Sequence, residues 1–144
     1  MLSKTCEYAV RATLIIAAET QQGNRISLRE IARKIDSPES FTAKILQKLA
    51  KNNIVDSLKG NGGGFYVSKE KLTKVKLGAI VLAIDGDAVF KRCSLGLNDC
   101  SEVKPCPFHH QYKPIREQLK TALDTTTLAD LVEGLVSNST FLRV

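Results

Sequence analysis

The sequence predicts a mainly helical fold with a small β-wing, in which a winged helix-turn-helix domain precedes a long C-terminal dimerisation helix. Three observations predict it. Two short amphipathic patterns meet at a tight corner, a glycine-rich segment separates two strand-like patterns, and an apolar stripe follows near the C-terminus. The 144 residues suit one small domain with a helical extension. We expect the DNA-binding winged domain over residues 1–75 and a helical dimerisation region over residues 76–144.

The first half of the chain contains three predicted helices. Residues 3–20 place apolar side chains on one face at steps of three and four. A second helix begins at residues 27–30, whose Ser-Leu-Arg-Glu is a capping box. Residues 36–37 form a corner, and Pro38 suits the first position of a third helix that should run to about Lys51. The second and third helices therefore predict a helix-turn-helix.

The third helix has one apolar face and one polar, basic face. Its apolar face should bury Phe41, Ile45, Leu46 and Leu49. On the polar face, base edges of double-stranded DNA would meet Ser40, Thr42, Ala43 and Lys44, and the DNA backbone would meet Lys48. An ordinary helical hairpin with a solvated lysine face would show the same pattern. The next segment distinguishes this hairpin from a DNA-binding helix-turn-helix.

That next segment predicts a β-hairpin. Residues 54–58 and 65–67 read as strands, and Lys-Gly-Asn-Gly-Gly-Gly at 59–64 joins them. A hairpin directly after such a helix is a wing, and we expect Lys59, Asn61 and Gly62 to touch the DNA backbone or minor groove. A nucleotide-binding loop is the weaker alternative, because the Lys-Ser/Thr pair is missing and no helix follows directly.

Positive charge is concentrated in the first half. Residues 1–76 carry 14 Lys and Arg against 7 Asp and Glu, whereas residues 77–144 carry 7 against 8. This imbalance suggests a polyanionic partner, although a solvated basic surface would look the same. The longest apolar run, residues 77–84, should be a buried helix and is too short to cross a membrane, and the N-terminus lacks a signal-peptide pattern. We expect a cytoplasmic protein without membrane contact.

The C-terminal region contains a predicted long helix at residues 107–124. Its stripe of Tyr112, Ile115, Leu119 and Ala122 lies outside the small winged domain and needs a partner, for which a second copy of the chain is the simplest choice. A two-fold homodimer would bind a pseudo-palindromic operator. A last helix should begin at residues 127–130, where Thr-Leu-Ala-Asp forms a cap.

The four cysteines are unevenly placed. Cys6 lies on the buried face of the first helix, where a small hydrophobic side chain suffices as an explanation. Cys93, Cys100 and Cys106 fall in the segment 91–106, which has no periodicity and should be a loop. In a cytosolic chain such thiols are metal ligands or reactive groups rather than disulfides. An enzyme with a cysteine nucleophile is disfavoured, because no oxyanion loop or paired acid and base accompanies them.

These motifs together resemble the Rrf-two family of bacterial transcription regulators, which includes the IscR and NsrR types. Residues 7–11, Glu-Tyr-Ala-Val-Arg, look like the family's first helix, and residues 27–32 and 46–49 look like its helix-turn-helix. The most specific match is residues 59–65, Lys-Gly-Asn-Gly-Gly-Gly-Phe, close to the family's Arg-Gly-x-Gly-Gly-Gly-Tyr wing. The resemblance implies a DNA-binding regulator and covers nearly the whole chain.

The resemblance also implies an iron–sulfur cluster, [2Fe–2S] or [4Fe–4S], on Cys93, Cys100 and Cys106. Their gaps of six and five residues match the family pattern, whereas structural zinc sites mostly use shorter Cys-x(2–4)-Cys spacings. His109 matches the fourth ligand of the IscR type and is our preferred metal ligand, while Glu7 matches a carboxylate that NsrR types present from the other subunit.

Such a cluster would switch operator affinity in response to redox state, nitric oxide or cluster supply. Several family members lack the cysteines. The alternative is therefore a regulator without a cluster, or stabilised by zinc, that is controlled through its thiols or a protein partner.

Overall fold

Eight helices and one β-hairpin make up residues 1–142, the part of the chain that the structure, a computed structural model, describes. The elements in chain order are α1 (Lys4–Gln21), α2 (Leu28–Lys34), α3 (Glu39–Lys51), β1 (Asp56–Leu58), β2 (Gly64–Tyr66), α4 (Lys69–Lys74), α5 (Leu77–Asp85), α6 (Ala88–Lys91), α7 (His109–Thr125) and α8 (Leu128–Val136). Residues 143–144 of the expected C-terminal region lie outside the described residues.

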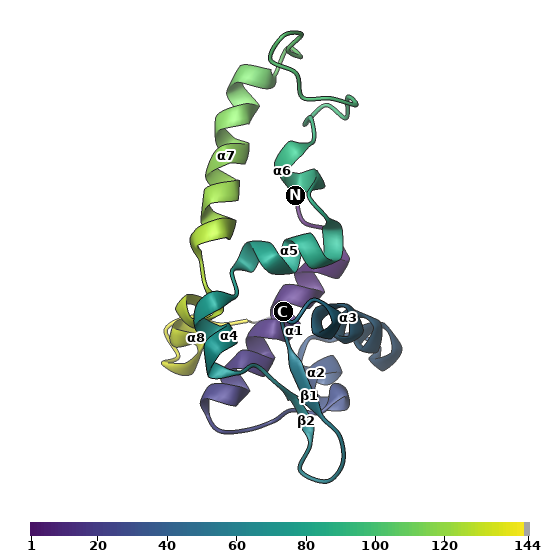
Figure 1. Cartoon of the computed structure of the whole chain (residues 1–144), viewed down its shortest axis with the longest axis vertical. Helices are drawn as coiled ribbons and strands as arrows, with labels where there is room; N and C mark the ends of the chain where they lie inside the picture. Colours follow the sequence, from purple (N-terminus) through teal and green to yellow (C-terminus); the bar gives the residue numbers. More distant parts are fainter. Residues whose placement is uncertain (143–144) are drawn as a thin grey trace.

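The molecule is elongated, with different elements at its two ends. The β1–β2 hairpin lies at one end of the long axis, and the loop that joins α6 to α7 lies at the other (Figure 1). Helix α7 runs from that loop back toward the body of the protein, where it meets α5. The hairpin and the cysteine-containing loop are therefore far apart.

Helix α1 is the centre of the core. It packs against α2, α3, β2, α5 and α8, because small buried side chains such as Ala9, Ala12 and Ala17 let neighbouring helices approach closely. Leu128 and Val132 of α8 belong to the same buried cluster as α1. The boundary near residue 75 stays a prediction, but the last helix clearly contributes to the core of the N-terminal half.

Side-chain caps start several helices where the sequence predicts them. The Ser3 and Ser27 hydroxyls accept hydrogen bonds from the backbone N–H groups of Cys6 and Glu30. Thr127 and Asp130 form a complete capping box at α8. Two starts differ from expectation by one or two residues. Pro38 is the N-cap of α3 rather than its first residue, and α7 begins at His109, whose N–H donates a 3.0 Å hydrogen bond to Cys106 O.

The wing depends on glycine at two positions. A Cβ at Gly63 would lie 2.1 Å from Leu58 O, and Gly64, at φ +133°, would place one 2.8 Å from Ile26 O. This close approach lets Ile26 and Phe65 exchange backbone hydrogen bonds of 2.8 and 3.1 Å, which ties the wing to the start of the helix-turn-helix. Strands β1 and β2 are antiparallel, with Ser57 opposite Phe65.

Three features of the second half were not expected. Helices α4 and α6 are additional short helices, and Leu82 of α5 is exposed although that helix was expected to be buried. The stripe on α7 is only partly covered, since Ile115 is 55% exposed while Leu119 packs against Val81 and Leu123. Within residues 1–142, no helix is long and apolar enough to span a membrane.

Candidate nucleic-acid interface and cysteine site

The outer face of α3 carries most of the predicted DNA-binding side chains. Ser40, Lys44 and Lys48 are exposed, and Ala43 is half-buried. The prediction that Thr42 faces DNA is wrong. Its side chain is 0% exposed, and its hydroxyl donates a 3.0 Å hydrogen bond to Pro38 O. The reason is helical periodicity, because position 42 shares the buried stripe of Ile45, Leu46 and Leu49.

Phe41 takes a position beside that stripe rather than within it. It is half-buried and meets the Tyr8 ring edge-on, with 5.6 Å between the ring centroids. The aromatic contact therefore contributes to the rotation of α3 against α1. That rotation determines which side chains of α3 face outward.

The wing presents Lys59, Asn61 and Gly62 to solvent. Sequence reasoning missed Arg25, which lies just before α2. Its guanidinium donates a 3.2 Å hydrogen bond to Gly62 O and lies over the Tyr66 ring, 5.6 Å from the centroid. Arg25 and Gly62 are 37 residues apart, so no local pattern could reveal this contact.

The exposed cations of this surface are not neutralised within the described part of the chain. Among residues 1–142, no acidic side chain forms an ion pair with Lys44, Lys48 or Lys59. Free cations on a helix and an adjacent wing can meet phosphates without first breaking an internal pair. The surface made by α3, the wing and Arg25 is therefore suited to a polyanion.

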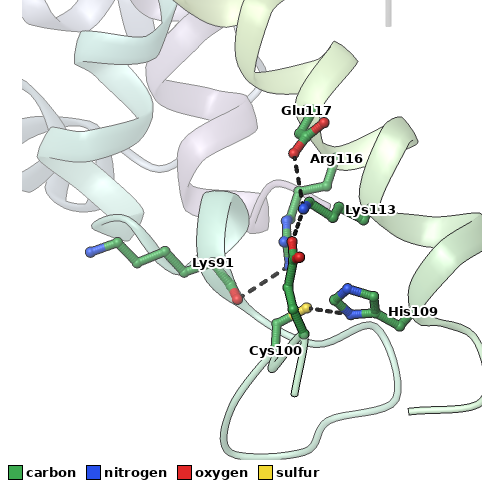
Figure 2. A network of polar contacts seen from close by, with 7 residues as sticks. Lys91, Cys100, His109, Lys113, Arg116 and Glu117 are labelled. Carbon is green, nitrogen blue, oxygen red and sulfur yellow. Dashed lines mark hydrogen bonds and ion pairs between the residues drawn. The ribbon is translucent and has the colours of Figure 1, made fainter. Parts of the chain in front are cut away.

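The three clustered cysteines lie in the loop between α6 and α7, as predicted. Two pairs of side chains form there. Cys93 Sγ and Cys106 Sγ are 3.7 Å apart. In the other pair, Cys100 Sγ is 3.3 Å from His109 Nδ1 (Figure 2). Cys93 is 4% exposed and His109 is 3% exposed, whereas Cys100 and Cys106 are half-buried. The structure thus brings all four predicted ligands into one loop and the first residue of α7.

The structure does not gather these side chains around one point. Among residues 1–142, no three His, Cys, Asp or Glu side chains are close enough to hold a single metal ion. The alternative ligand Glu7 forms an ion pair with Lys4, at 2.9 Å, and the hydrogen bond from that ammonium lowers the pKa of the Glu7 carboxyl. Backbone N–H groups of Leu95 and Leu97 lower the pKa of the Cys93 thiol, and the Arg116 charge adds to this effect.

Two cations of α7 hold the cysteine loop. Arg116 donates from Nη1 to Lys91 O at 3.3 Å (Figure 2) and to Arg92 O at 3.2 Å, immediately before Cys93. Lys113 forms an ion pair with Glu102, which lies between Cys100 and Cys106. Neither contact could be predicted, since each joins the helix to a loop without periodicity.

Helix α7 is in turn connected to the DNA-facing elements. It packs against α5, which packs against both α1 and α3. Cys6, Val81 and Leu123 form a buried cluster that joins α1, α5 and α7. Cys6 is 0% exposed, and burial raises the pKa of its thiol to about 12, which agrees with its interpretation as a small hydrophobic side chain.

Comparison with known proteins identifies the family. The sequence model of the Rrf2 family, described as an iron-dependent transcriptional regulator, matches residues 2–134. The chain belongs to the Rrf2 family. The HTH-type transcriptional regulator IscR of Yersinia pseudotuberculosis is 30% identical to this Rrf2 protein, over 92% of this chain and 79% of that one.

Two solved structures share the fold. CymR, the global cysteine regulator of B. subtilis, matches with a TM-score of 0.73 and 22% identity, covering 92% of this chain and 96% of that chain. T. potens IscR matches with a TM-score of 0.72 and 19% identity, covering 99% and 93%. The predicted family and winged-helix fold are confirmed, and this Rrf2 protein is a transcription regulator rather than an enzyme.

Proposed function

We propose that this Rrf2 protein is a homodimeric regulator whose affinity for double-stranded operator DNA is switched by an iron–sulfur cluster on Cys93, Cys100, Cys106 and His109. The observation that carries the proposal is the pairing of these four side chains in the loop before α7. The description of the family as an iron-dependent transcriptional regulator supports it.

The donor set fits a two-iron cluster better than a mononuclear site. A tetrahedral zinc ion needs four ligands at bond lengths of about 2.0–2.3 Å from one point. No three described ligand side chains meet that condition. A [2Fe–2S] cluster would instead be held by four protein ligands spread over two irons, and Cys93, Cys106, Cys100 and His109 would form such a set. When bound, such a cluster would supply one-electron redox chemistry and reactivity toward oxidants and nitric oxide.

His109 is favoured over Glu7 as the fourth ligand because of where each lies. His109 is buried with Nδ1 facing Cys100, whereas Glu7 is on α1 and paired with Lys4. Arg116 and Lys113 keep the loop against α7, so the ligands start from a restricted geometry. Restricting them in advance reduces the ordering cost of binding.

Coupling to DNA follows the packing of the helices. Cluster binding would order the cysteine loop, and Arg116 and Lys113 would transmit this change to α7. Helix α7 packs against α5, and α5 packs against α3, so the change would reach the DNA-facing helix. A coupling free energy of about 1–3 kcal/mol would change operator affinity roughly 5- to 150-fold. Redox state, nitric oxide and cluster supply are the candidate signals.

The DNA face consists of α3 and the wing. Ser40, Ala43 and Lys44 meet base edges, and Lys48 contacts the DNA backbone. Lys59, Asn61 and Gly62 contact the backbone or the minor groove. Thr42 is left out because it is buried. A homodimer formed through α7 would place two such faces on a pseudo-palindromic operator, and a DNA target together with reduced thiols implies a cytoplasmic location.

Anaerobic purification tests the proposal. The wild-type protein should be brown and contain iron and sulfide, and Cys93→Ala, Cys100→Ala and Cys106→Ala should each be colourless or unstable. Cys6→Ala is the matched control and should stay brown. His109→Ala should alter cluster stability more than assembly, because another ligand can take the open position.

DNA binding is measured with a duplex selected from a randomised pool by the cluster-bound protein. The triple cysteine variant should differ from it in affinity, by roughly 5- to 150-fold. Equal affinity would contradict switching by the cluster. A colourless protein with stoichiometric zinc, or a triple variant that still binds iron and sulfide, would contradict the ligand assignment.

A further inference from the structure

The two pairs of side chains in the cysteine site differ in chemistry, because one joins two thiols and the other joins a thiol to an imidazole. Cys93 Sγ and Cys106 Sγ are in van der Waals contact at 3.7 Å, whereas Cys100 faces His109. A disulfide bond needs the two sulfurs about 2.05 Å apart. Residues 92–108 contain no helix or strand, so this segment can shorten the distance without unfolding α6 or α7.

We propose that Cys93 and Cys106 form an intramolecular disulfide bond when the cluster-free protein meets a hydroperoxide. The bond itself requires no cluster, and only its regulatory consequence rests on the proposed function. It would join the residues that follow α6 and precede α7, and would withdraw two of the four proposed ligands until a reductant restores them.

The partner of each thiol favours this pair over Cys100, which faces His109, and access favours it over Cys6. Cys106 is half-buried, and Cys93 is on the wall of a pocket of about 520 Å³ that Ser3, Asp85, Arg92 and Tyr112 also line. A peroxide is small enough to enter such a pocket. Cys6 is fully buried among α1, α5 and α7, so it should not react in the folded protein.

The reaction is a two-electron oxidation of two thiols by one hydrogen peroxide. One thiolate sulfur attacks a peroxide oxygen, the O–O bond breaks, and the other oxygen takes a proton and leaves as water. The second sulfur then displaces the oxygen of the resulting sulfenic acid, which also leaves as water while the S–S bond forms. Two thiols lose two protons and two electrons, and the peroxide becomes two molecules of water.

The test oxidises the full-length apo protein, prepared by chelation under anaerobic, reducing conditions, with one equivalent of hydrogen peroxide. Thiol counting should show the loss of two of the four free thiols, and peptide mapping should find one linked pair, Cys93–Cys106, that dithiothreitol reverses. Cys100→Ser and Cys6→Ser should retain the link. Cys93→Ser and Cys106→Ser should lose it.

Oxidation in guanidinium distinguishes native geometry from chance. In an unfolded chain, loop closure favours pairs that are near in sequence, so Cys100–Cys106 and Cys93–Cys100 links should exceed Cys93–Cys106. The folded protein should show the opposite preference, and its circular dichroism should match that of the reduced apo protein. Equal amounts of the three links in the folded protein, or no link, would overturn the proposal. Neither arm uses a cluster or DNA, so this outcome is independent of the proposed function.

Discussion

Single residues set the position of the wing against the helix-turn-helix. Gly64 lets the hairpin approach Ile26, and Arg25, beside Ile26, reaches the tip of the wing at Gly62. The Arg25 guanidinium also lies over Tyr66 at the base of the hairpin. One side chain therefore contacts both ends of the wing and adds a positive charge to it.

Replacing Arg25 with Ala should weaken operator binding by about fivefold, or roughly 1 kcal/mol, because an exposed cation–π contact alone is worth about 0.5–1 kcal/mol and the wing also loses the hydrogen bond to Gly62 O. Arg25→Lys should be intermediate, because an ammonium can still donate to Gly62 O. Lys69→Ala, on α4, removes the same charge outside the wing and α3 and serves as the control. Binding isotherms at several salt concentrations measure the effect. If Lys69→Ala loses as much operator affinity as Arg25→Ala, Arg25 contributes only its positive charge and not its position against the wing.

At the scale of elements, local signals predicted the helices that begin with a side-chain cap and bury a stripe. Ser3, Ser27 and Thr127 each accept a backbone N–H, and the glycines at 60–64 indicated the hairpin. Helix α6 was missed because it has no buried residue and no side-chain cap. Helix α4 was missed although Ser68 caps it, since it buries only Leu72 and therefore shows no stripe.

The candidate site was predictable as far as its ligands but not its supports. The spacing of Cys93, Cys100 and Cys106 and the position of His109 are visible in the sequence. The contacts of Arg116 with Lys91 O and of Lys113 with Glu102 depend on how the loop folds back on α7. The sequence of the loop has no periodicity from which this path could be predicted. Thr42 was misplaced because a polar residue beside a basic face looks exposed until the helix rotation is known.

The tether between α7 and the cysteine loop can be tested without a cluster. Arg116→Ala removes the donor to Lys91 O and Arg92 O, so α6 and the residues around Cys93 should exchange amide hydrogens faster. Lys120→Ala, which breaks an exposed Lys120–Asp124 pair on the same helix, is the control and should leave that exchange unchanged. Hydrogen exchange with mass spectrometry measures both. Unchanged exchange in Arg116→Ala would contradict the proposal that Arg116 couples the cysteine loop to α7.

The cap of α8 predicts a dependence of stability on pH. Hydrogen bonds from the backbone N–H and hydroxyl of Thr127 lower the pKa of the Asp130 carboxyl below its usual value. A lowered pKa means that the carboxylate contributes stability above the unfolded-state value of about 3.9, and that this contribution is lost as pH falls through the folded-state pKa. Asp130→Asn should therefore lower the denaturation midpoint at pH 7 and differ little from wild type at about pH 2.

Denaturation by urea at the two pH values measures the difference. Glu133→Gln, an exposed carboxylate on the same helix, controls for the loss of one negative charge and should not show the same pattern. A difference between wild type and Asp130→Asn that persists undiminished at acid pH would show that shape rather than charge makes the cap.

At the scale of the whole molecule, the long axis separates the cysteine loop from the wing, with α7 reaching outward between them (Figure 1). One face of α7 is anchored by Leu119 and Leu123 on α5, but Ile115 is exposed. A groove along α7 is lined by Pro114, Glu117, Gln118, Thr121 and Ala122. A second copy packed along this helix would cover both, which is the physical basis of the proposed homodimer.

Replacing Ile115 with Glu should therefore produce a monomer, because the charge would be buried without a partner at the interface. Lys120→Gln changes the net charge of α7 by the same amount and should remain dimeric. Sedimentation at micromolar concentration distinguishes the two states, and circular dichroism checks that the exposed substitution leaves the fold intact. A monomer has only one α3 and one wing, so its affinity for a full operator should fall toward that for a half-site, while the wild type should discriminate strongly between them. If Ile115→Glu sediments as the wild type does, α7 is not the interface, and the two-fold operator must be explained by another surface.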